Sequence, residues 1–278
     1  MRQNYLTVDV EDYYQVSAFE PLVGVHNWDQ YHSRVVRNTT NILDALARHH
    51  IKATFFVLGW VGERHPDLVK EIMANGHVIG CHSYQHRLIY QLSPDEFRED
   101  TRRATDILEQ ATGKSVVGYR APSYSITRES LWAYDILEEL GFTYSSSVFP
   151  IHHDRYGIPD APRFKYQVPG HTITEYPLST WRFLGRNIPV SGGGYFRIFP
   201  YWFTKKGLSK INSRDKQAFV FFIHPWETDP QQPRMKGATL LSRFRHYTNL
   251  SKTAERFEKL LTDFQFGPLP ETNEANTG

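Results

Sequence analysis

The chain has 278 residues, of which 40% are hydrophobic and 22% are charged, which is sufficient for one large α/β domain with a single core. Its 32 lysines and arginines nearly balance its 30 aspartates and glutamates, and the formal net charge of +2 argues against nucleic acid as a partner. The single cysteine, Cys81, excludes an internal disulfide and is expected to be a small buried residue.

The start of the chain bears on its location. It passes from Met1 into the strand-like stretch YLTVDV without the apolar core of a signal peptide. No apolar run approaches the roughly 20 residues of a membrane helix. We therefore expect a cytoplasmic protein with no membrane span.

Seven short apolar runs bounded by glycine, proline or histidine are predicted to be strands. In chain order they are residues 5–10, 52–59, 77–82, 115–120, 142–148, 172–178 and 218–224. Apolar residues at helical spacing predict helices around residues 42–46, 68–73, 131–140 and 257–264. This alternation predicts an α/β fold of parallel strands with crossover helices.

Several helix ends carry capping residues. Residues 93–96, Ser-Pro-Asp-Glu, form a capping box with proline at the first helical position, and Thr127 is placed to cap the next helix. Gly113 and Gly141 are expected to close these two helices.

We expect a single domain over residues 1–267, with a family-specific extension from about residue 225. Residues 268–278 are polar enough to be disordered. The largest non-periodic insert, residues 13–33, is expected to lie over the end of the first strand, where loops carry function.

The stretch HSYQH places two histidines four residues apart just after a predicted buried strand. His82 and His86 have the spacing with which two imidazoles hold one metal ion, although ordinary surface or core histidines show the same spacing. A catalytic site of this kind needs a third ligand, and the acidic residues Asp9, Glu11 and Asp12 at the end of the first strand are the best source.

Polar residues also follow other predicted strands. Arg120, Pro122 and Tyr124 follow the fourth strand, and His224 and Trp226 follow the seventh. In a barrel of parallel strands, all of these strand ends converge on one face.

With these motifs the sequence resembles the polysaccharide deacetylases with the NodB homology domain, carbohydrate esterase family four. LTVDVED, HSYQH, RAPSY and FIHPWE match its motifs in the family's order, over a resemblance from about Leu6 to Phe266. TVDVEDYYQVSAF, SGGGYFR and IHPWETDPQQPR are most similar to the deacetylases of bacterial exopolysaccharide loci, associated with PEP-CTERM and exosortase systems. The resemblance implies a distorted (β/α) barrel of about seven parallel strands.

The resemblance also implies a divalent metal ion, with zinc first and cobalt, manganese, nickel or iron as alternatives. His82 and His86 would be its nitrogen ligands, and Asp9 would be the general base. The family's metal aspartate has no direct match, because the chain reads Asp-Val-Glu-Asp without the family glycine. Asp12 is preferred as the third ligand for its shorter side chain, whereas strand alternation favours Glu11.

Further roles follow from the same resemblance. Arg120 would hold the base, Tyr124 would supply a pocket wall and a backbone N–H for the oxyanion, and His224 would be the general acid. Pro122 and Trp226 are expected to contact substrate. Relatives often carry a bracing aspartate where this chain has Ser145, so the bracing would be weaker or supplied elsewhere.

Other glycine-rich, aromatic and basic stretches have simpler interpretations. SGGGYF (191–196) lacks a following helix start and a lysine for binding phosphate, so it is expected to be a tight loop near a sugar or the barrel rim. Most aromatics here are expected to pack, while some stack on sugars. They are Trp181, Tyr195, Tyr201, Trp202 and Trp226. The Lys205-Lys206 pair is expected on a solvated helix face.

The expected activity is metal-dependent hydrolysis of N-acetyl groups on amino sugars of a polysaccharide or its precursor, in exopolysaccharide biosynthesis. The expected partner is an N-acetylated glycan. The alternatives are hydrolysis of a non-sugar amide on the same fold, and a non-catalytic carbohydrate-binding relative.

Overall fold

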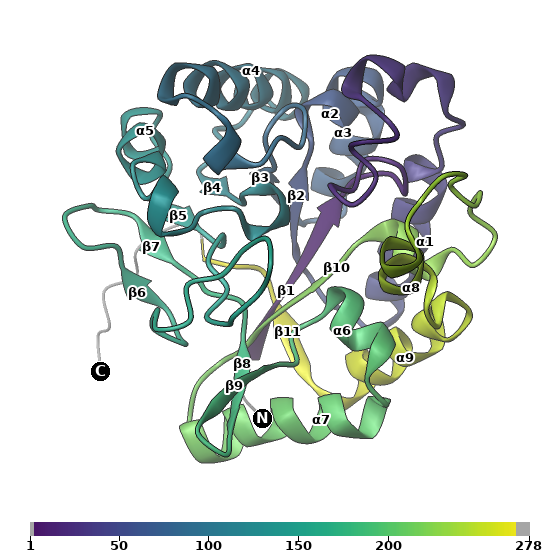
Figure 1. Cartoon of the computed structure of the whole chain (residues 1–278), viewed down its shortest axis with the longest axis vertical. Helices are drawn as coiled ribbons and strands as arrows, with labels where there is room; N and C mark the ends of the chain where they lie inside the picture. Colours follow the sequence, from purple (N-terminus) through teal and green to yellow (C-terminus); the bar gives the residue numbers. More distant parts are fainter. Residues whose placement is uncertain (1–2, 271–278) are drawn as a thin grey trace.

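The computed structural model describes residues 3–270, which form a curled, mostly parallel sheet surrounded by helices (Figure 1). The sheet order is β10-β1-β2-β3-β4-β5-β7-β6. Its parallel strands are β1 (Gln3–Val10), β2 (Thr54–Val57), β3 (Val78–Cys81), β4 (Gly118–Tyr119), β5 (Tyr144–Ser145), β7 (Thr174–Glu175) and β10 (Val220–Ile223). Antiparallel β6 (Tyr166–Gln167) ends one edge, and β11 (Gln265–Gly267) pairs with the start of β1.

All seven predicted strands are present and parallel, so the predicted distorted barrel is confirmed as a half-barrel. β4, β5 and β7 are only two residues long, much shorter than their apolar runs. The helices are α1 (Val35–Arg48), α2 (Gly59–Arg64), α3 (Pro66–Ala74), α4 (Pro94–Thr112), α5 (Ala133–Glu139), α6 (Gly193–Ile198), α7 (Tyr201–Lys210), α8 (Leu240–Tyr247) and α9 (Leu250–Asp263). No helix among residues 3–270 is both long and apolar enough to cross a bilayer.

Strand β1 is at the centre of the architecture because it pairs with β10, β2 and β11. Leu6, Val8 and Val10 belong to the large hydrophobic core. Thr7 and Asp9 alternate with them and reach the inner side of the sheet, where both bond to the buried side chain of Arg120. The alternation of β1 therefore separates the packing face from the polar face.

The helix ends agree with the capping residues, with one difference. Ser93 and Glu96 exchange hydrogen bonds at the start of α4, and Gly113 ends this helix in the left-handed region at φ 68°. Thr127 caps a short 3-10 helix, Arg128–Ser130, instead of α5. The predicted helix over 131–140 therefore begins later, at Ala133.

A separate two-stranded sheet is formed by β8 (Thr180–Phe183) and β9 (Arg186–Pro189). This hairpin lies beside α7 at the lower end of Figure 1. Trp181 of β8 packs against Phe203 of α7, with ring centroids 5.5 Å apart. The sequence analysis did not predict this hairpin.

Two smaller predictions concern Cys81 and the end of the chain. Cys81 is fully buried at the end of β3, as expected. Of the tail predicted to be disordered, residues 271–278 lie outside the described residues.

Candidate functional site

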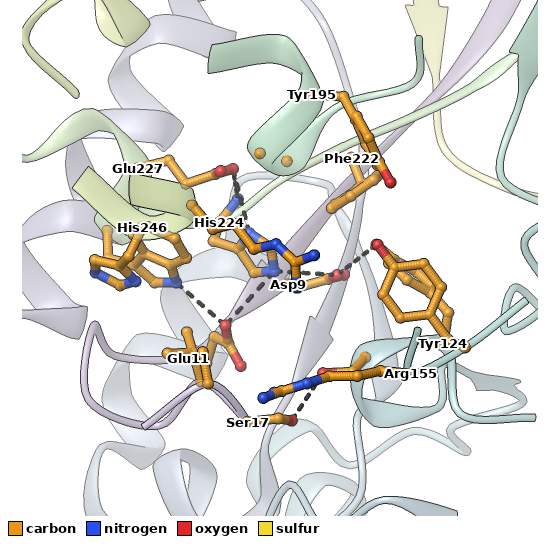
Figure 2. Close-up of a pocket in the computed structure, with 18 of the residues that line it drawn as sticks. Asp9, Glu11, Ser17, Tyr124, Arg155, Tyr195, Phe222, His224, Glu227 and His246 are labelled. Carbon is orange, nitrogen blue, oxygen red and sulfur yellow. Dashed lines mark hydrogen bonds and ion pairs between the residues drawn. The ribbon is translucent and has the colours of Figure 1, made fainter. Parts of the chain in front are cut away.

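The carboxyl ends of β1, β3, β4 and β10 meet at a pocket of about 310 Å³ (Figure 2). The predicted site residues that line it are Asp9, Glu11, His82, His86, Tyr124, His224 and Trp226. Ser17 from the insert over 13–33 also lines the pocket, so this insert covers the end of β1 as expected. Pro122 is buried and is not among the described residues that line the pocket.

His82 and His86 lie on one turn after β3, with ring centroids 5.2 Å apart. Nδ1 of His82 is 2.8 Å from the carbonyl oxygen of Arg120, which fixes the proton on Nδ1 and leaves the Nε2 lone pair available. Burial lowers the pKa of His82 to about 4, so the ring is neutral at pH 7. Ser83 and His86 adopt positive φ angles of 64° and 55°, a strained backbone of the kind found at functional sites.

Glu11 completes a cluster with these two histidines. One ligand atom from each of the three residues lies within 4.8 Å of the other two. Glu11 Oε2 is 2.9 Å from Nε2 of His86 and makes no hydrogen bond within the described part of the chain. Burial alone would raise the pKa of Glu11. The neighbouring imidazoles of His86, His224 and His82, in their protonated form, outweigh burial and lower this pKa to about 2.

This donor set fits a divalent cation. Two imidazole nitrogens and one buried carboxylate are a three-ligand set that leaves a position for water. The Oε2 atom of Glu11 is buried and has His86 Nε2 as its close neighbour in the described chain, so a cation at this position could also contact it.

Asp12, the preferred third ligand in the sequence analysis, is not in this cluster. Its Oδ2 atom accepts hydrogen bonds from Ser33 Oγ (2.7 Å), Arg34 N (2.8 Å) and Val35 N (3.1 Å). These backbone groups open α1, so Asp12 satisfies N–H groups at the start of a helix. The structure therefore brings the alternative, Glu11, to the histidines.

Asp9 is held on one side and open on the other. Its Oδ1 atom accepts a 2.7 Å hydrogen bond from Nη1 of Arg120, and both side chains are buried. Its Oδ2 atom lies 3.8 Å from Nε2 of His224 and 3.3 Å from the hydroxyl of Tyr124. The guanidinium of Arg120 therefore fixes one carboxylate oxygen, while the other faces the pocket.

Arg120 is braced by backbone and hydroxyl groups. Nε donates to the carbonyl oxygen of Ser146 (2.9 Å), Nη2 donates to the Ser146 hydroxyl (2.6 Å), and Nη1 also donates to Thr7 Oγ1 (2.6 Å). Ser145 instead contacts Ser147, whose hydroxyl accepts from the Ala121 N–H. The bracing is therefore supplied by residues other than Ser145.

Glu175 is a buried acid behind this serine segment that the sequence analysis did not single out. Its Oε1 atom accepts hydrogen bonds from the N–H groups of Ser147 (2.7 Å) and Val148 (2.9 Å), and its Oε2 atom accepts from Tyr134. Burial raises its pKa, while these donors oppose the shift. An acid inside the predicted strand TITEYPL was the available signal, because an acidic residue in a buried strand needs partners.

Tyr124 contributes in a different way from the expected one. Its backbone N–H donates to the carbonyl oxygen of Ala121 (3.0 Å), so this N–H is already engaged. Its hydroxyl donates to Asp9, and burial raises the pKa of this hydroxyl well above the usual value. Ser123 and Tyr124 both have positive φ angles, 49° and 54°, so a second strained turn borders the pocket.

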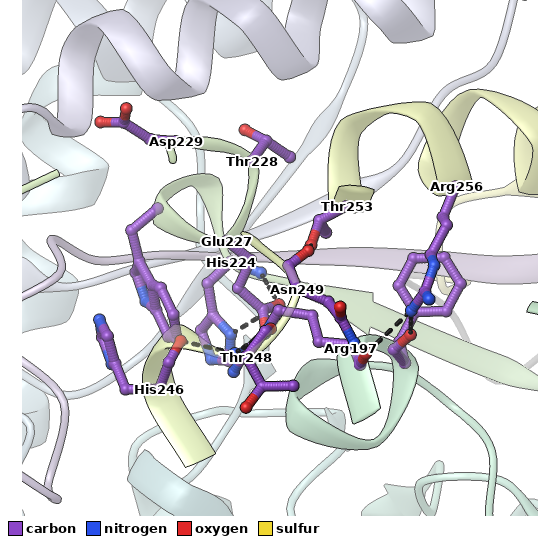
Figure 3. Close-up of polar contacts among 12 residues, drawn as sticks. Arg197, His224, Glu227, Thr228, Asp229, His246, Thr248, Asn249, Thr253 and Arg256 are labelled. Atoms are coloured by element: carbon purple, nitrogen blue, oxygen red, sulfur yellow. Dashed lines mark hydrogen bonds and ion pairs between the residues drawn. The ribbon is translucent and has the colours of Figure 1, made fainter. Parts of the chain in front are cut away.

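His224 is held by a buried acid and a buried arginine (Figure 3). Its Nδ1 atom lies 3.2 Å from Glu227 Oε2, and Arg197 Nε donates to Glu227 Oε1 at 2.8 Å. Burial lowers the pKa of His224, but the carboxylates of Glu11, Glu227 and Asp9 outweigh it and raise the pKa to about 9. The ring therefore holds a proton at neutral pH.

Neither Glu227 nor Arg197 was singled out from the sequence. Glu227 stands in the quoted motif FIHPWE, three residues after His224, where it closes a capping box. Arg197 stands at the end of α6 and also donates to the carbonyl oxygen of His246 (2.6 Å). Their pairing depends on tertiary contacts between segments about thirty residues apart.

SGGGYF has a structural role beside β10. Gly192 (φ 127°) forms a bridge with Phe222, and a Cβ there would lie 1.9 Å from the Phe222 carbonyl oxygen. The prediction that the backbone approaches the barrel rim is therefore correct. The expectation that no helix follows is wrong, because α6 begins at Gly193.

The five predicted aromatics differ in their environments. Tyr195 and Trp226 line the pocket, and Trp226 stacks on His246 with centroids 4.1 Å apart. Trp181 packs in the core, whereas Trp202 is 64% exposed. Trp226 also donates from Nε1 to Glu11 Oε1 (3.1 Å), which orients the carboxylate of the cluster formed with His82 and His86.

Two family models match the chain. Residues 25–145 match the model named Polysaccharide deacetylase, and residues 146–273 match a domain of unknown function, DUF3473. Segments of curated proteins are similar as well. They are a peptidoglycan-N-acetylglucosamine deacetylase of Bacillus cereus (40% identity over 96 residues, 34% of this chain and 35% of that protein) and a chitooligosaccharide deacetylase of Rhizobium leguminosarum bv. trifolii (29% over 114 residues, 41% and 49%). The chain thus spans less than half the length of either relative.

Solved structures share the fold. A Mycobacterium smegmatis protein assigned as a polysaccharide deacetylase has a TM-score of 0.57 at 20% identity, covering 98% of this chain and 94% of that one. A peptidoglycan N-acetylglucosamine deacetylase has a TM-score of 0.51 at 18% identity, covering 96% and 86%.

The pocket draws on both matched segments and on the residues before them. His82, His86 and Tyr124 lie within 25–145, His224 and Glu227 lie within 146–273, and Asp9 and Glu11 precede both. Neither matched segment alone contains the whole pocket.

Proposed function

We propose that this chain, which carries a polysaccharide deacetylase domain matched over residues 25–145, removes N-acetyl groups from the amino sugars of a glycan. The observation that carries the proposal is the placement of Asp9 and His224 beside the cluster of Glu11, His82 and His86. The deacetylase names of the partly matching relatives support an acetylated amino sugar as the substrate.

Glu11, His82 and His86 would hold a divalent metal ion, for which zinc is the first choice and cobalt, manganese, nickel or iron are alternatives. When bound, such an ion polarises a carbonyl and lowers the pKa of water. This chemistry would take place where the ends of β1 and β3 meet.

Asp9 is the general base in this proposal. Its Oδ2 atom takes one proton from the water whose oxygen bonds to the acetyl carbon, while Arg120 on Oδ1 keeps the carboxylate oriented. The tetrahedral intermediate that forms carries the former carbonyl oxygen as an oxyanion. The Tyr124 hydroxyl beside Oδ2 restricts where the carboxylate can turn.

His224 is the general acid. Its Nε2 atom lies 3.8 Å from Asp9 and 3.5 Å from Glu11, so it faces the reacting groups, whereas Nδ1 faces Glu227. Nε2 donates its proton to the sugar nitrogen as the carbon–nitrogen bond breaks, which releases acetate and a free amino sugar. The proton taken by Asp9 and the proton given by His224 balance the hydrolysis.

We propose an exopolysaccharide as the biological substrate, because the chain resembles the deacetylases of exopolysaccharide loci. If the chain is cytoplasmic, it would act on a precursor of that polysaccharide. The deciding experiment combines metal analysis of the purified protein with acetate release from N-acetylglucosamine oligomers. Stoichiometric metal and acetate release are expected. Metal without acetate release from any acetylated glycan would favour a non-sugar amide, and absence of both would favour a non-catalytic relative.

A further inference from the structure

The β8–β9 hairpin and α7 together expose large apolar side chains, and none of these side chains lines the pocket. Leu184 at the hairpin tip is 86% exposed, Trp202 on α7 is 64% exposed, and Phe183 is 45% exposed. Trp181 connects them, since its ring lies 4.7 Å from Phe183 and 5.5 Å from Phe203, the neighbour of Trp202. The hairpin and α7 therefore lie side by side, at the lower end of Figure 1, and share these ring contacts.

The turn of this hairpin carries an unfavourable residue for its backbone. Leu184 and Gly185 form the two-residue loop, with φ angles of 46° and 74°. A loop with two positive φ angles strongly prefers Asn-Gly or Gly-Gly, and leucine in this region is strained. Because the Leu184 side chain is almost fully exposed, the described chain offers no packing that offsets this strain. A strained leucine that no packing within the fold stabilises indicates that its side chain contacts something outside the chain.

The same region is strongly basic although the whole chain is nearly neutral. From Tyr176 to Arg214 the sequence contains seven lysines and arginines and no aspartate or glutamate, although Arg197 is buried against Glu227 and Lys205 pairs with Asp263 of α9. Arg182, Arg186 and Lys206 are exposed and have no carboxylate partner within the described part of the chain. We call these apolar and basic residues together the hairpin surface. It comprises Arg182, Phe183, Leu184, Arg186, Trp202 and Lys206.

We propose that the hairpin surface binds an anionic phospholipid bilayer. Leucine, phenylalanine and tryptophan beside arginine and lysine are the combination that partitions into the headgroup region of anionic membranes. Leu184 and Phe183 would enter the interface at the hairpin tip, with Trp202 beside them and the cations on lipid phosphates. The binding needs neither a spanning helix nor any pocket residue.

Two other occupants fit the hairpin surface less well. A two-fold dimer would place this basic surface against its own copy, so like charges would face one another. A glycan would stack on flat aromatic faces in a concave site, whereas the tip is convex and led by an aliphatic leucine. Charge and shape therefore favour the bilayer.

Vesicle co-sedimentation of the full chain tests the proposal, with phosphatidylcholine vesicles containing about one third phosphatidylglycerol and with pure phosphatidylcholine vesicles. The test variant is Leu184→Asn, which creates the preferred Asn-Gly turn and should stabilise the hairpin while removing the apolar tip. The matched control is Leu240→Asn on α8, since Leu240 is 85% exposed and lies in another stretch without acidic residues.

We expect the unmodified chain to sediment with anionic vesicles, more weakly at high salt, and far less with pure phosphatidylcholine. Leu184→Asn should lower the partition coefficient about tenfold, and Leu240→Asn should leave it unchanged. The proposal is overturned if the chain ignores anionic vesicles, if the two variants behave alike, or if the chain self-associates through Leu184 in sedimentation velocity. Since no substrate is used, the outcome is independent of the proposed hydrolase function.

Discussion

His224 and Glu227 are joined twice, because Glu227 Oε2 lies 3.2 Å from the imidazole Nδ1 and 3.0 Å from the backbone N–H of His224. One buried carboxylate thus fixes both the ring and the backbone of the same residue. Arg197 holds the other carboxylate oxygen at 2.8 Å. This relationship leads to the first prediction.

Replacing Glu227 with Gln should lower kcat by about 10–100-fold while metal content stays the same, because the variant removes the charge that holds the His224 ring. The measurement is acetate release with parallel metal analysis. Asp229→Asn is the control, since Asp229 pairs with Arg34 instead of His224. If Glu227→Gln kept the full rate, Glu227 would be only a structural cap.

Replacing Glu11 should affect metal content, whereas replacing Asp12 should affect the free energy of unfolding. Glu11→Gln should lose bound metal, because the cluster keeps only two nitrogen ligands. Asp12→Ala should keep the metal but lower the free energy of unfolding by about 1–3 kcal/mol, because buried N–H groups at the start of α1 lose their acceptor. Metal analysis and urea unfolding distinguish the two. Loss of metal in Asp12→Ala alone would restore Asp12 as the ligand.

Replacing Asp9 with Asn should leave metal bound and reduce acetate release by about 10²–10⁴-fold, the usual contribution of a positioned base. His82→Ala is the comparison, since it should lose metal and activity together. If the Asp9→Asn variant turned over at the normal rate, Asp9 would be excluded as the base.

The free energy of unfolding should fall in mild acid because His77 is buried in its neutral form. Its ring is buried, accepts a hydrogen bond from the Ala53 N–H (3.1 Å) and lies 4.9 Å from the Phe55 ring. Burial lowers its pKa from 6.5 to about 4. Between these values the unfolded chain binds the extra proton, so stability is full above pH 6.5 and decreases as the pH falls toward 4.

The check is urea unfolding of the wild type and of His77→Asn, in which the amide keeps an acceptor near the Nδ1 position but cannot titrate. The wild type should lose up to about 1.4 kcal/mol per pH unit more than the variant over this interval. Parallel curves for the two proteins would mean that His77 is not the responsible group.

Much of the fold followed from short-range patterns. The seven strand runs were recognisable because buried parallel strands are continuous apolar segments between glycine, proline or histidine. The hairpin β8–β9 was missed because Leu184-Gly185 is an unusual pair for such a turn. The late start of α5 was missed because Thr127 and Ser130 close a separate turn first.

The cluster of Glu11, His82 and His86 shows which of two arguments agrees with the positions of the acidic side chains. Thr7, Asp9 and Glu11 have the same parity along the chain, and the first two face the inner side of the sheet. That period of two favoured Glu11, whereas the argument from side-chain length favoured Asp12. The second argument failed because the start of α1 needs Asp12 as an acceptor. Such long-range demands on one side chain are not visible in its neighbours.

The pairing of β10 with β1 places residues from opposite ends of the chain side by side, Val8 beside Ile223. Asp9, the proposed base, therefore stands on the first strand, and His224, the proposed proton donor, stands just beyond β10. Exchanging the segment after residue 145 between relatives would replace the donor and its carboxylate while leaving His82 and His86 untouched. Because Trp226 of the same segment donates to Glu11, such an exchange would also change what orients the proposed third ligand.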